Sequence, residues 1–183
     1  KDPARFKAMV TFFATARGIL QIFSGDEMMF SSADLRAGDP GLRVDFPGGW
    51  EGDEFDFFTD EGRAAADVDF DGQPIEKGMR KDVYDYCRKL FRWRKDAEVI
   101  HNGKTLHFIP GRNGYGYFRY NDTDTVFVFI NPSDEAVHIP WSDYSEITDG
   151  LGTGTNVITG EKVTVSNDTE VGPMEAIVIE YKK

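Results

Sequence analysis

Apolar residues near the start of the chain recur with a helical period. They are spaced i, i+3, i+4 and i+7, which places them along one stripe of a helix. The stripe consists of Phe6, Met9, Val10 and Phe13. Asp2 is a good N-cap residue and Pro3 suits the first helical position. We expect a helix over residues 3–16, with Gly18 just after its end.

A short apolar run follows this helix. Residues 19–24 read Ile-Leu-Gln-Ile-Phe-Ser, which favours a buried strand. The helix, the short joint and the strand together are typical of half of a β/α repeat. Asp26 and Glu27 come directly after the predicted strand.

The pattern then loses its period over residues 31–78, which are acidic and rich in glycine. Between Asp34 and Asp71 there are twelve acidic residues and three arginines. Six aromatic residues could anchor this long loop, so we expect it to be ordered. They are Phe46, Trp50, Phe55, Phe57, Phe58 and Phe70.

A second helical stripe predicts a helix over residues 80–95. Its apolar members are Val83, Tyr86, Leu90 and Trp93, with Cys87 and Phe91 beside them. After Asn102 the period becomes that of short strands separated by turn signals. The candidate strands are 105–109, 116–120, 125–130, 137–139, 156–159, 162–165 and 176–181.

These patterns predict an α+β protein. Residues 1–100 are expected to be arranged as helix, strand, long loop and helix, which fits a segment of a β/α barrel. Residues 101–183 form an all-β antiparallel sandwich at the C-terminal end. The chain begins Lys-Asp-Pro without Met, which suggests a piece of a longer protein.

Composition narrows the choice of partners. The chain has 183 residues and a net charge of −11, which argues against nucleic acid and gives no support for an anionic membrane surface. No apolar stretch is long enough to span a bilayer. The single cysteine, Cys87, excludes a disulfide framework and a cysteine metal site, and we expect it to be a small buried hydrophobe. These features do not indicate the cellular compartment of the protein.

Two groups of residues could carry chemistry. Polar groups at the C-terminal ends of barrel strands line the active face, so Asp26 and Glu27 could belong to a site; otherwise they cap a turn or form ion pairs. Asp39, Arg43 and Trp50 form a set suited to sugar, in which the charged groups bind vicinal hydroxyls and the indole packs on the ring. A structural ion pair between Asp39 and Arg43 is the alternative.

The segment from Asp67 to Gly78 imitates a calcium-binding loop. Asp67, Asp69 and Asp71 fit the first three ligand positions, but Gly78 stands where a bidentate glutamate is needed. The fit is weak, and a solvated acidic loop is favoured. The three histidines have no metal-ligand spacing; they are His101, His107 and His138.

Three segments together resemble the α-amylase family of glycoside hydrolases. "ARGILQIFSGDEMMF" resembles the last barrel-strand segment, although Leu20 replaces the usual proline and Phe23 and Ser24 replace tyrosines. "GDPGLRVDFPGGW" resembles the following loop of the neopullulanase and cyclomaltodextrinase branch. "YDYCRKLFRWRKDAEVIHNGKTLHF" resembles the final barrel helix running into the C-terminal sandwich.

The resemblance implies the C-terminal part of an enzyme that acts on α-1,4-glucans by a retaining mechanism. It also implies that residues 1–100 are the last part of a (β/α)8 catalytic barrel and that residues 101–183 are its C-terminal β-sandwich domain. The family's catalytic carboxylates would precede Lys1, so no residue here is assigned as catalytic and the chain alone is expected to be inactive. Asp39 and Arg43 match a sugar-contacting pair, and Glu27 matches a structural acid. No cofactor is expected, apart from calcium in the parent enzyme. The bacterial periplasm or the extracellular space would suit that parent.

Two further expectations concern partners. The alternative to a hydrolase fragment is a stand-alone carbohydrate-binding or interaction sandwich without activity. Alternating aromatics such as Phe118, Phe127 and Phe129 fit a core better than an exposed binding row. Because the predicted strand at 19–24 would lack barrel neighbours, we also expect self-association through the exposed barrel remnant.

Overall fold

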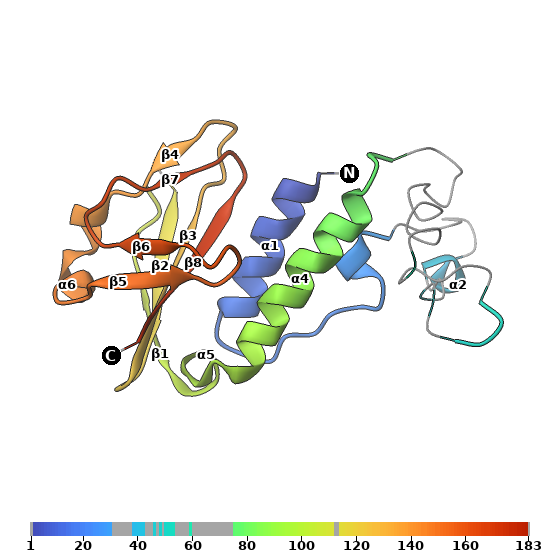
Figure 1. Cartoon of the computed structure of the whole chain (residues 1–183), viewed down its shortest axis with the longest axis horizontal. Coiled ribbons are helices and arrows are strands. Elements are labelled where there is room, and N and C mark those ends of the chain that lie inside the picture. The colour runs from blue at the N-terminus through green and yellow to red at the C-terminus, as the bar shows by residue number, and fades with distance from the viewer. Residues whose placement is uncertain are drawn as a thin grey trace. The chain divides into compact units, whose positions relative to one another are not determined.

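The computed structural model describes residues 2–30, 38–42, 46, 48, 50–53, 59, 75–111 and 114–182. Over these ranges helices come first and antiparallel strands follow, with a short helical stretch between β4 (Val137–His138) and β5 (Thr153–Asn156) (Figure 1). The α+β class predicted from the sequence is confirmed. No helix in the described ranges is long and apolar enough to cross a membrane.

Helix α1 spans Pro3–Thr15 and begins as the sequence predicts. The Asp2 carboxylate accepts a hydrogen bond from the backbone N–H of Arg5 at 3.0 Å, which satisfies one of the free donors of the first turn. Its buried face differs from the predicted stripe, because Met9 and Phe13 are 48% and 52% exposed. The buried positions are instead mostly small residues, namely Ala8, Val10, Thr11, Ala14 and Thr15.

Helix α4 spans Met79–Asp96 and buries the predicted stripe. Val83 and Leu90 are fully buried, and Cys87 lies between them at 1% exposure, as expected for a small hydrophobe. A short helix that the sequence pattern did not predict, α5 (Glu98–Asn102), follows one residue later. It connects α4 to the first strand.

The strand expected at residues 19–24 is not formed. These residues have irregular backbone, and Ile19 is fully exposed. A strand needs a neighbouring strand to accept and donate its backbone hydrogen bonds, and no described segment pairs with this one. An apolar run is therefore not sufficient here, because its ladder partner is missing from the described residues.

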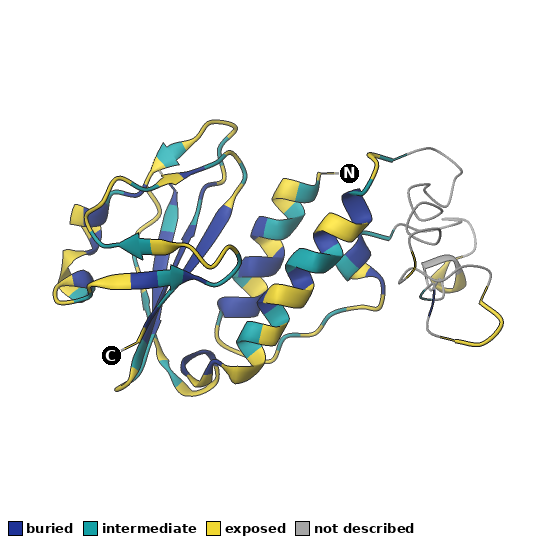
Figure 2. Cartoon of the chain, viewed as in Figure 1, coloured by how far each residue is buried: buried dark blue, intermediate teal, exposed yellow. Residues whose placement is uncertain are grey.

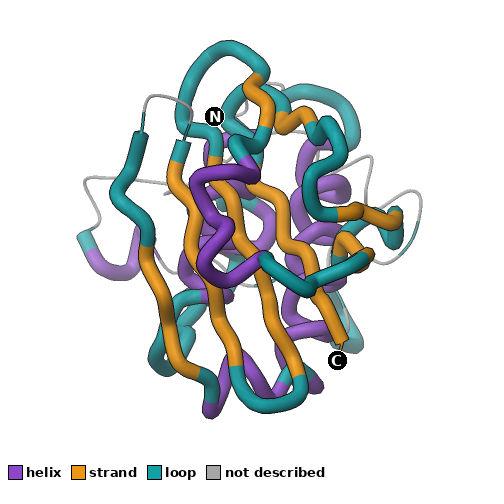
Figure 3. The backbone as a smooth tube through the Cα atoms, turned by 90° about the vertical axis from the view of Figure 1, so that its left-hand side faces the viewer, coloured by secondary structure: helices purple, strands orange, loops and turns teal. Residues whose placement is uncertain are grey.

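The strands form two antiparallel sheets, and the strands of the larger sheet are seen side by side, face-on, in Figure 3. The larger sheet has six strands in the order β1-β2-β3-β8-β5-β6, and the smaller pairs β4 with β7. The bounds are β1 Lys104–His107, β2 Tyr115–Tyr120, β3 Asp124–Ile130, β4 Val137–His138, β5 Thr153–Asn156, β6 Lys162–Thr164, β7 Glu170–Val171 and β8 Ala176–Lys182. Phe118 of β2 pairs with Phe127 of β3, which sets the register of the central strands.

Each face of the larger sheet carries its own core. On one face the aromatic side chains of Phe118, Phe127 and Phe129 pack with Val171 of the smaller sheet. On the other face Tyr117, Val126, Val128 and Val178 pack with residues of α5, and partly buried side chains that include Phe12 and Trp93 lie against them. Figure 2 shows the central strands largely buried. The alternating aromatics are therefore core residues.

The fifth strand lies earlier than predicted. The sequence suggested residues 156–159, but β5 ends at Asn156. The Asn156 side chain accepts hydrogen bonds from the backbone N–H groups of Ile158 and Thr159, at 2.9 and 3.3 Å, and so builds a turn. Gly160 completes this turn with a φ of 80°.

The chain divides into two compact units. Their limits differ from the boundary at residue 100 that the sequence predicts. One unit contains residues 2–20 and 88–183, and the other contains residues 21–87. Helix α1 belongs with the sheet because it contacts β3 and β8. The assignment of residues 1–100 to a barrel and of 101–183 to a sandwich stays a prediction.

Candidate functional site

The acidic turn after residue 24 is held together by its own carboxylates. It contains the 3-10 helix η1 (Asp26–Met28). Asp26 accepts a hydrogen bond from the N–H of Phe23 at 3.1 Å, and Glu27 accepts one from the N–H of Gly25 at 3.0 Å. Both acids are thus engaged with backbone of the same turn, which is the turn-capping alternative raised by the sequence.

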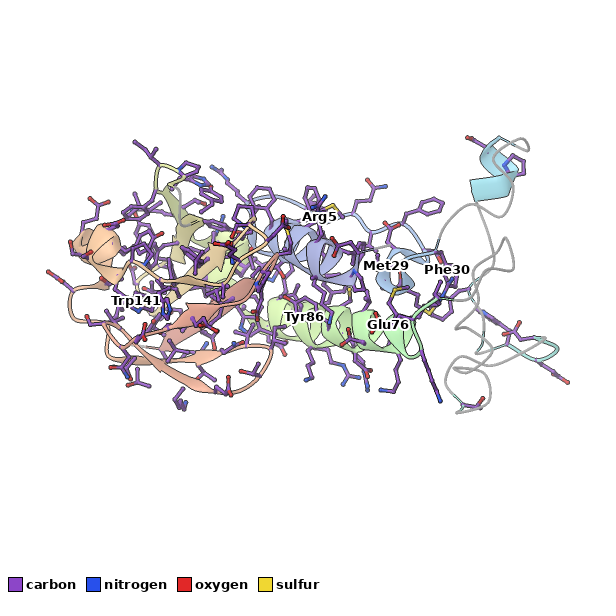
Figure 4. The ribbon with its side chains drawn as sticks, turned by 90° about the horizontal axis from the view of Figure 1, so that it is seen from above. Arg5, Met29, Phe30, Glu76, Tyr86 and Trp141 are labelled. Carbon is purple, nitrogen blue, oxygen red and sulfur yellow. The ribbon has the colours of Figure 1, made fainter. Side chains whose placement is uncertain are left out.

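The turn closes on a small apolar cluster. Met28 is fully buried, and partly buried Phe30, Phe46 and Tyr84 pack against it. Phe30 lies at the end of the turn, next to Met29 (Figure 4). Gly25 has a φ of 97°, and a Cβ placed there would lie 2.5 Å from the Phe30 ring. A side chain at position 25 would therefore displace Phe30.

A buried arginine completes this cluster, and the sequence pattern gave no sign of it. Arg80, in the first turn of α4, is only 2% exposed. Its guanidinium lies 4.8 Å from the centroid of the Phe30 ring, which is a cation–π contact. The arginine links the acidic turn to the start of α4. A charged residue at the start of an amphipathic helix normally indicates a solvated position, so the sequence could not reveal its burial.

The three residues of the predicted sugar-binding set lie in the loop region. Asp39 begins the short helix α2 (Asp39–Leu42) and is exposed. Trp50 is 77% exposed, and its backbone N–H donates to the Asp53 carboxylate at 3.1 Å. Arg43 lies outside the described residues. Asp39 and Trp50 are thus both exposed, while their joint action with Arg43 on a sugar stays a prediction.

The metal predictions are not decided by the structure. Asp67, Asp69 and Asp71 lie outside the described residues, so calcium binding there stays a prediction. Within the described part of the chain, no group of three or more histidine, cysteine or acidic side chains is placed to hold a metal ion.

The histidines make separate contacts. His101 is hydrogen-bonded to the backbone carbonyl of Arg94 at 2.9 Å. His138 of β4 is bonded to Asp168 at 2.6 Å. His107 of β1 contacts the hydroxyl of Tyr115.

The part of the chain that holds the strands is similar to a known domain family. Residues 105–180 match the family model described as the cyclo-malto-dextrinase C-terminal domain. The β-rich part of the chain is therefore similar to this C-terminal domain. This match covers β2 to β7 completely and most of β1 and β8, and it confirms the resemblance that the sequence motifs suggested.

Solved structures extend the likeness to nearly the whole chain. An Anoxybacillus α-amylase matches 98% of this chain with 15% identity and a TM-score of 0.60. An α-amylase from Geobacillus thermoleovorans matches 100% with 15% identity and a TM-score of 0.60, and a trehalulose synthase matches 98% with 18% identity and a TM-score of 0.61. At these identities the likeness shows the fold. The chain spans 32%, 34% and 38% of the length of these three proteins.

Proposed function

We propose that this cyclomaltodextrinase-type chain supplies the C-terminal part of a glycoside hydrolase that acts on α-1,4-glucans. Starch, maltooligosaccharides, cyclodextrin and pullulan are the candidate substrates. The match of residues 105–180 to the cyclo-malto-dextrinase C-terminal domain carries the proposal. Structural neighbours described in complex with maltose, maltotriose and acarbose support it. Another structural neighbour, a MutB mutant, is described in complex with sucrose. Sucrose is therefore the alternative substrate to the α-glucans.

The catalytic step itself is assigned to the parent enzyme. A retaining mechanism needs two carboxyl groups about 5–5.5 Å apart, one as nucleophile and one as acid/base. Asp26 and Glu27 are bonded to the backbone of their own turn. The family motifs quoted above place no nucleophile or acid/base on this chain. We therefore expect the chain alone to be inactive.

The test compares the chain with the complete product of its gene. Both are incubated with maltooligosaccharides, cyclodextrin and sucrose, and released reducing ends are measured. We expect hydrolysis of the α-glucans by the complete product and none by the chain. Reducing ends released by the purified chain would contradict its expected inactivity. A complete product that begins near Lys1 and binds sugar without cleaving it would favour the stand-alone binding module.

Within the complete enzyme, Asp39, Arg43 and Trp50 are proposed to contact sugar at the non-reducing side of the cleaved bond. The exposure of Asp39 and Trp50 supports this role. Removing a charged hydrogen bond to substrate costs about 1.5–3 kcal/mol, so Asp39→Asn should lower kcat/KM by roughly ten- to a hundredfold. Asp134→Asn, which also changes an exposed acid, is the matched control. Equal kcat/KM values for the two variants would remove Asp39 from the substrate site.

A further inference from the structure

Aromatic side chains gather on one face of the larger sheet at its β1 edge. His107 of β1 pairs directly with Tyr117 of β2. Tyr115 lies two residues before Tyr117 on the same strand, so both tyrosines project to the same face. Three rings from two neighbouring strands therefore lie together.

Two of these rings form one flat surface. The planes of His107 and Tyr115 differ by only 4°, and their centroids are 6.2 Å apart. A hydrogen bond joins His107 Nδ1 to the Tyr115 hydroxyl, and both of these atoms lie on ring edges. The planes of two rings stacked face to face would be about 3.5 Å apart, which is longer than this hydrogen bond. The rings thus lie edge to edge, and we call this surface the His107–Tyr115 platform.

The platform is backed by buried side chains. Tyr117 is fully buried, with its centroid 5.8 Å from that of His107 and 5.2 Å from that of Tyr115. The Tyr117 hydroxyl is hydrogen-bonded to Thr15 of α1, and Phe12 lies edge-on against its ring with centroids 6.0 Å apart. These contacts hold the backing ring in place, so the platform is preorganised.

The platform remains accessible to solvent. His107 is exposed and Tyr115 is half-buried. Ile109, just beyond the end of β1, is 95% exposed. The exposed His107 and Ile109 side chains lie at the same end of β1, where a ligand can reach them.

The platform also offers a hydrogen-bond donor at its outer edge. Burial raises the pKa of Tyr115, so its hydroxyl is protonated at neutral pH and can donate to His107 Nδ1. When Nδ1 accepts, the neutral imidazole carries its proton on Nε2. No described residue hydrogen-bonds to Nε2. In this tautomer an N–H group points away from Tyr115 in the plane of the platform. In the other tautomer, in which Nδ1 donates to the Tyr115 hydroxyl, Nε2 is an acceptor, so Nε2 can hydrogen-bond a ligand hydroxyl in either case.

We propose that the His107–Tyr115 platform binds a pyranose ring of an α-glucan chain. The C–H face of the sugar would pack on the two rings, and Nε2–H would donate to a sugar hydroxyl. The choice of an α-glucan rests on the proposed function, whereas the platform itself rests on the geometry of the rings. The site lies on the C-terminal domain and serves to hold substrate, because it contains no carboxylate pair for cleavage.

Titration with maltoheptaose, followed through the ring NMR signals of His107 and Tyr115, tests the proposal. We expect saturable shifts of both rings, with a dissociation constant on the order of millimolar. His107→Ala and Tyr115→Ala should each raise this constant by about tenfold, and Tyr115→Phe should raise it less because the ring is kept. His138→Ala, which removes another exposed histidine of the same domain, should leave it unchanged.

The outcomes separate this site from the proposed function. Unchanged ring signals at saturating maltoheptaose would overturn the platform as a sugar site, even if the complete gene product hydrolyses α-glucans. Shifts with cellohexaose but not with maltoheptaose would overturn the α-glucan assignment. Equal weakening by His138→Ala and His107→Ala would also contradict the site. Because His107 is exposed, its replacement should not prevent folding.

Discussion

Arg119 is a fully buried cation whose two terminal nitrogens donate to backbone carbonyls and a hydroxyl. Its guanidinium donates to the carbonyl oxygens of Ile100 and Gly103, each at 2.9 Å, and to the Thr105 hydroxyl at 2.8 Å. These carbonyls belong to the end of α5, where the helix dipole is negative. Burial lowers the pKa of Arg119, yet an arginine stays protonated in proteins.

We expect Arg119→Met to lower the free energy of unfolding by about 2–4 kcal/mol, because it leaves several buried carbonyls without a donor. Urea unfolding followed by circular dichroism measures the change. The control is Arg5→Met on the exposed side of α1, which should cost less than about 0.5 kcal/mol. Similar losses for the two variants would show that the carbonyl contacts contribute little.

The hydroxyl of Tyr144 makes the stability of the fold depend on pH in the alkaline range. It is buried in the aromatic core, and burial, with a smaller contribution from Asp143, raises the pKa of Tyr144 to about 12. An unfolded tyrosine has a pKa of about 10. Between these two values the unfolded chain loses the proton and the folded protein keeps it, so stability is full below about pH 10 and falls as the pH rises toward about 12.

Tyr144→Phe should therefore weaken the fall of stability between about pH 10 and about pH 12, by at most about 1.4 kcal/mol per pH unit. Urea unfolding repeated across this range gives the slope directly. Tyr120→Phe, which changes a half-buried tyrosine of β2, is the comparison. If the slope is the same with and without the Tyr144 hydroxyl, that group is not the source of the alkaline loss.

At the scale of elements, β2 depends on a glycine that faces an aromatic ring. A Cβ at Gly116 would lie 2.5 Å from the Tyr144 hydroxyl oxygen and 2.6 Å from the adjoining ring carbon. Tyr144 packs against Phe108, Phe118 and Phe127, so its ring cannot easily move. The absence of a side chain at position 116 lets η3 (Trp141–Tyr144) pack on the strand.

Gly116→Ala should lower the free energy of unfolding by about 1–3 kcal/mol through overpacking. Gly152→Ala makes the same chemical change where no atom lies within 4 Å of the added carbon. That control should be neutral or stabilise the fold by up to about 1 kcal/mol, since alanine restricts the unfolded chain. Thermal unfolding of the pair separates crowding from the general effect of replacing glycine. Equal melting temperatures would mean that Tyr144 adjusts freely.

At the scale of the whole molecule, self-association stays a prediction, and α1 offers a surface for it. Met9 and Phe13 lie four residues apart on this helix and are about half exposed, at 48% and 52%. We expect the average mass by light scattering to rise across the micromolar range. Phe13→Glu should move that rise to higher concentration, whereas Ser142→Glu on exposed η3 should not. A constant monomer mass would contradict self-association.

The sequence by itself determined those elements whose burial follows from local period. The stripe of Val83, Cys87 and Leu90 predicted α4, and the alternating Phe127 and Phe129 predicted β3 and its place in the core. Strong periodic patterns succeed because a helix or strand must turn its apolar positions to one side or alternate them. The order of three sequence motifs also indicated the resemblance to α-amylase enzymes.

Only the tertiary structure decided the features that depend on partners distant in sequence. The apolar run at 19–24 forms no strand, because pairing requires a neighbour that the local pattern does not contain. From the sequence, Arg119 is expected to lie at the surface. In the structure it is buried, and carbonyl groups at the end of α5 accept its hydrogen bonds. The His107–Tyr115 platform likewise exists only because the β1–β2 register brings two separate strands together. Each of these features is set by long-range packing and hydrogen bonding, which a one-dimensional pattern does not encode.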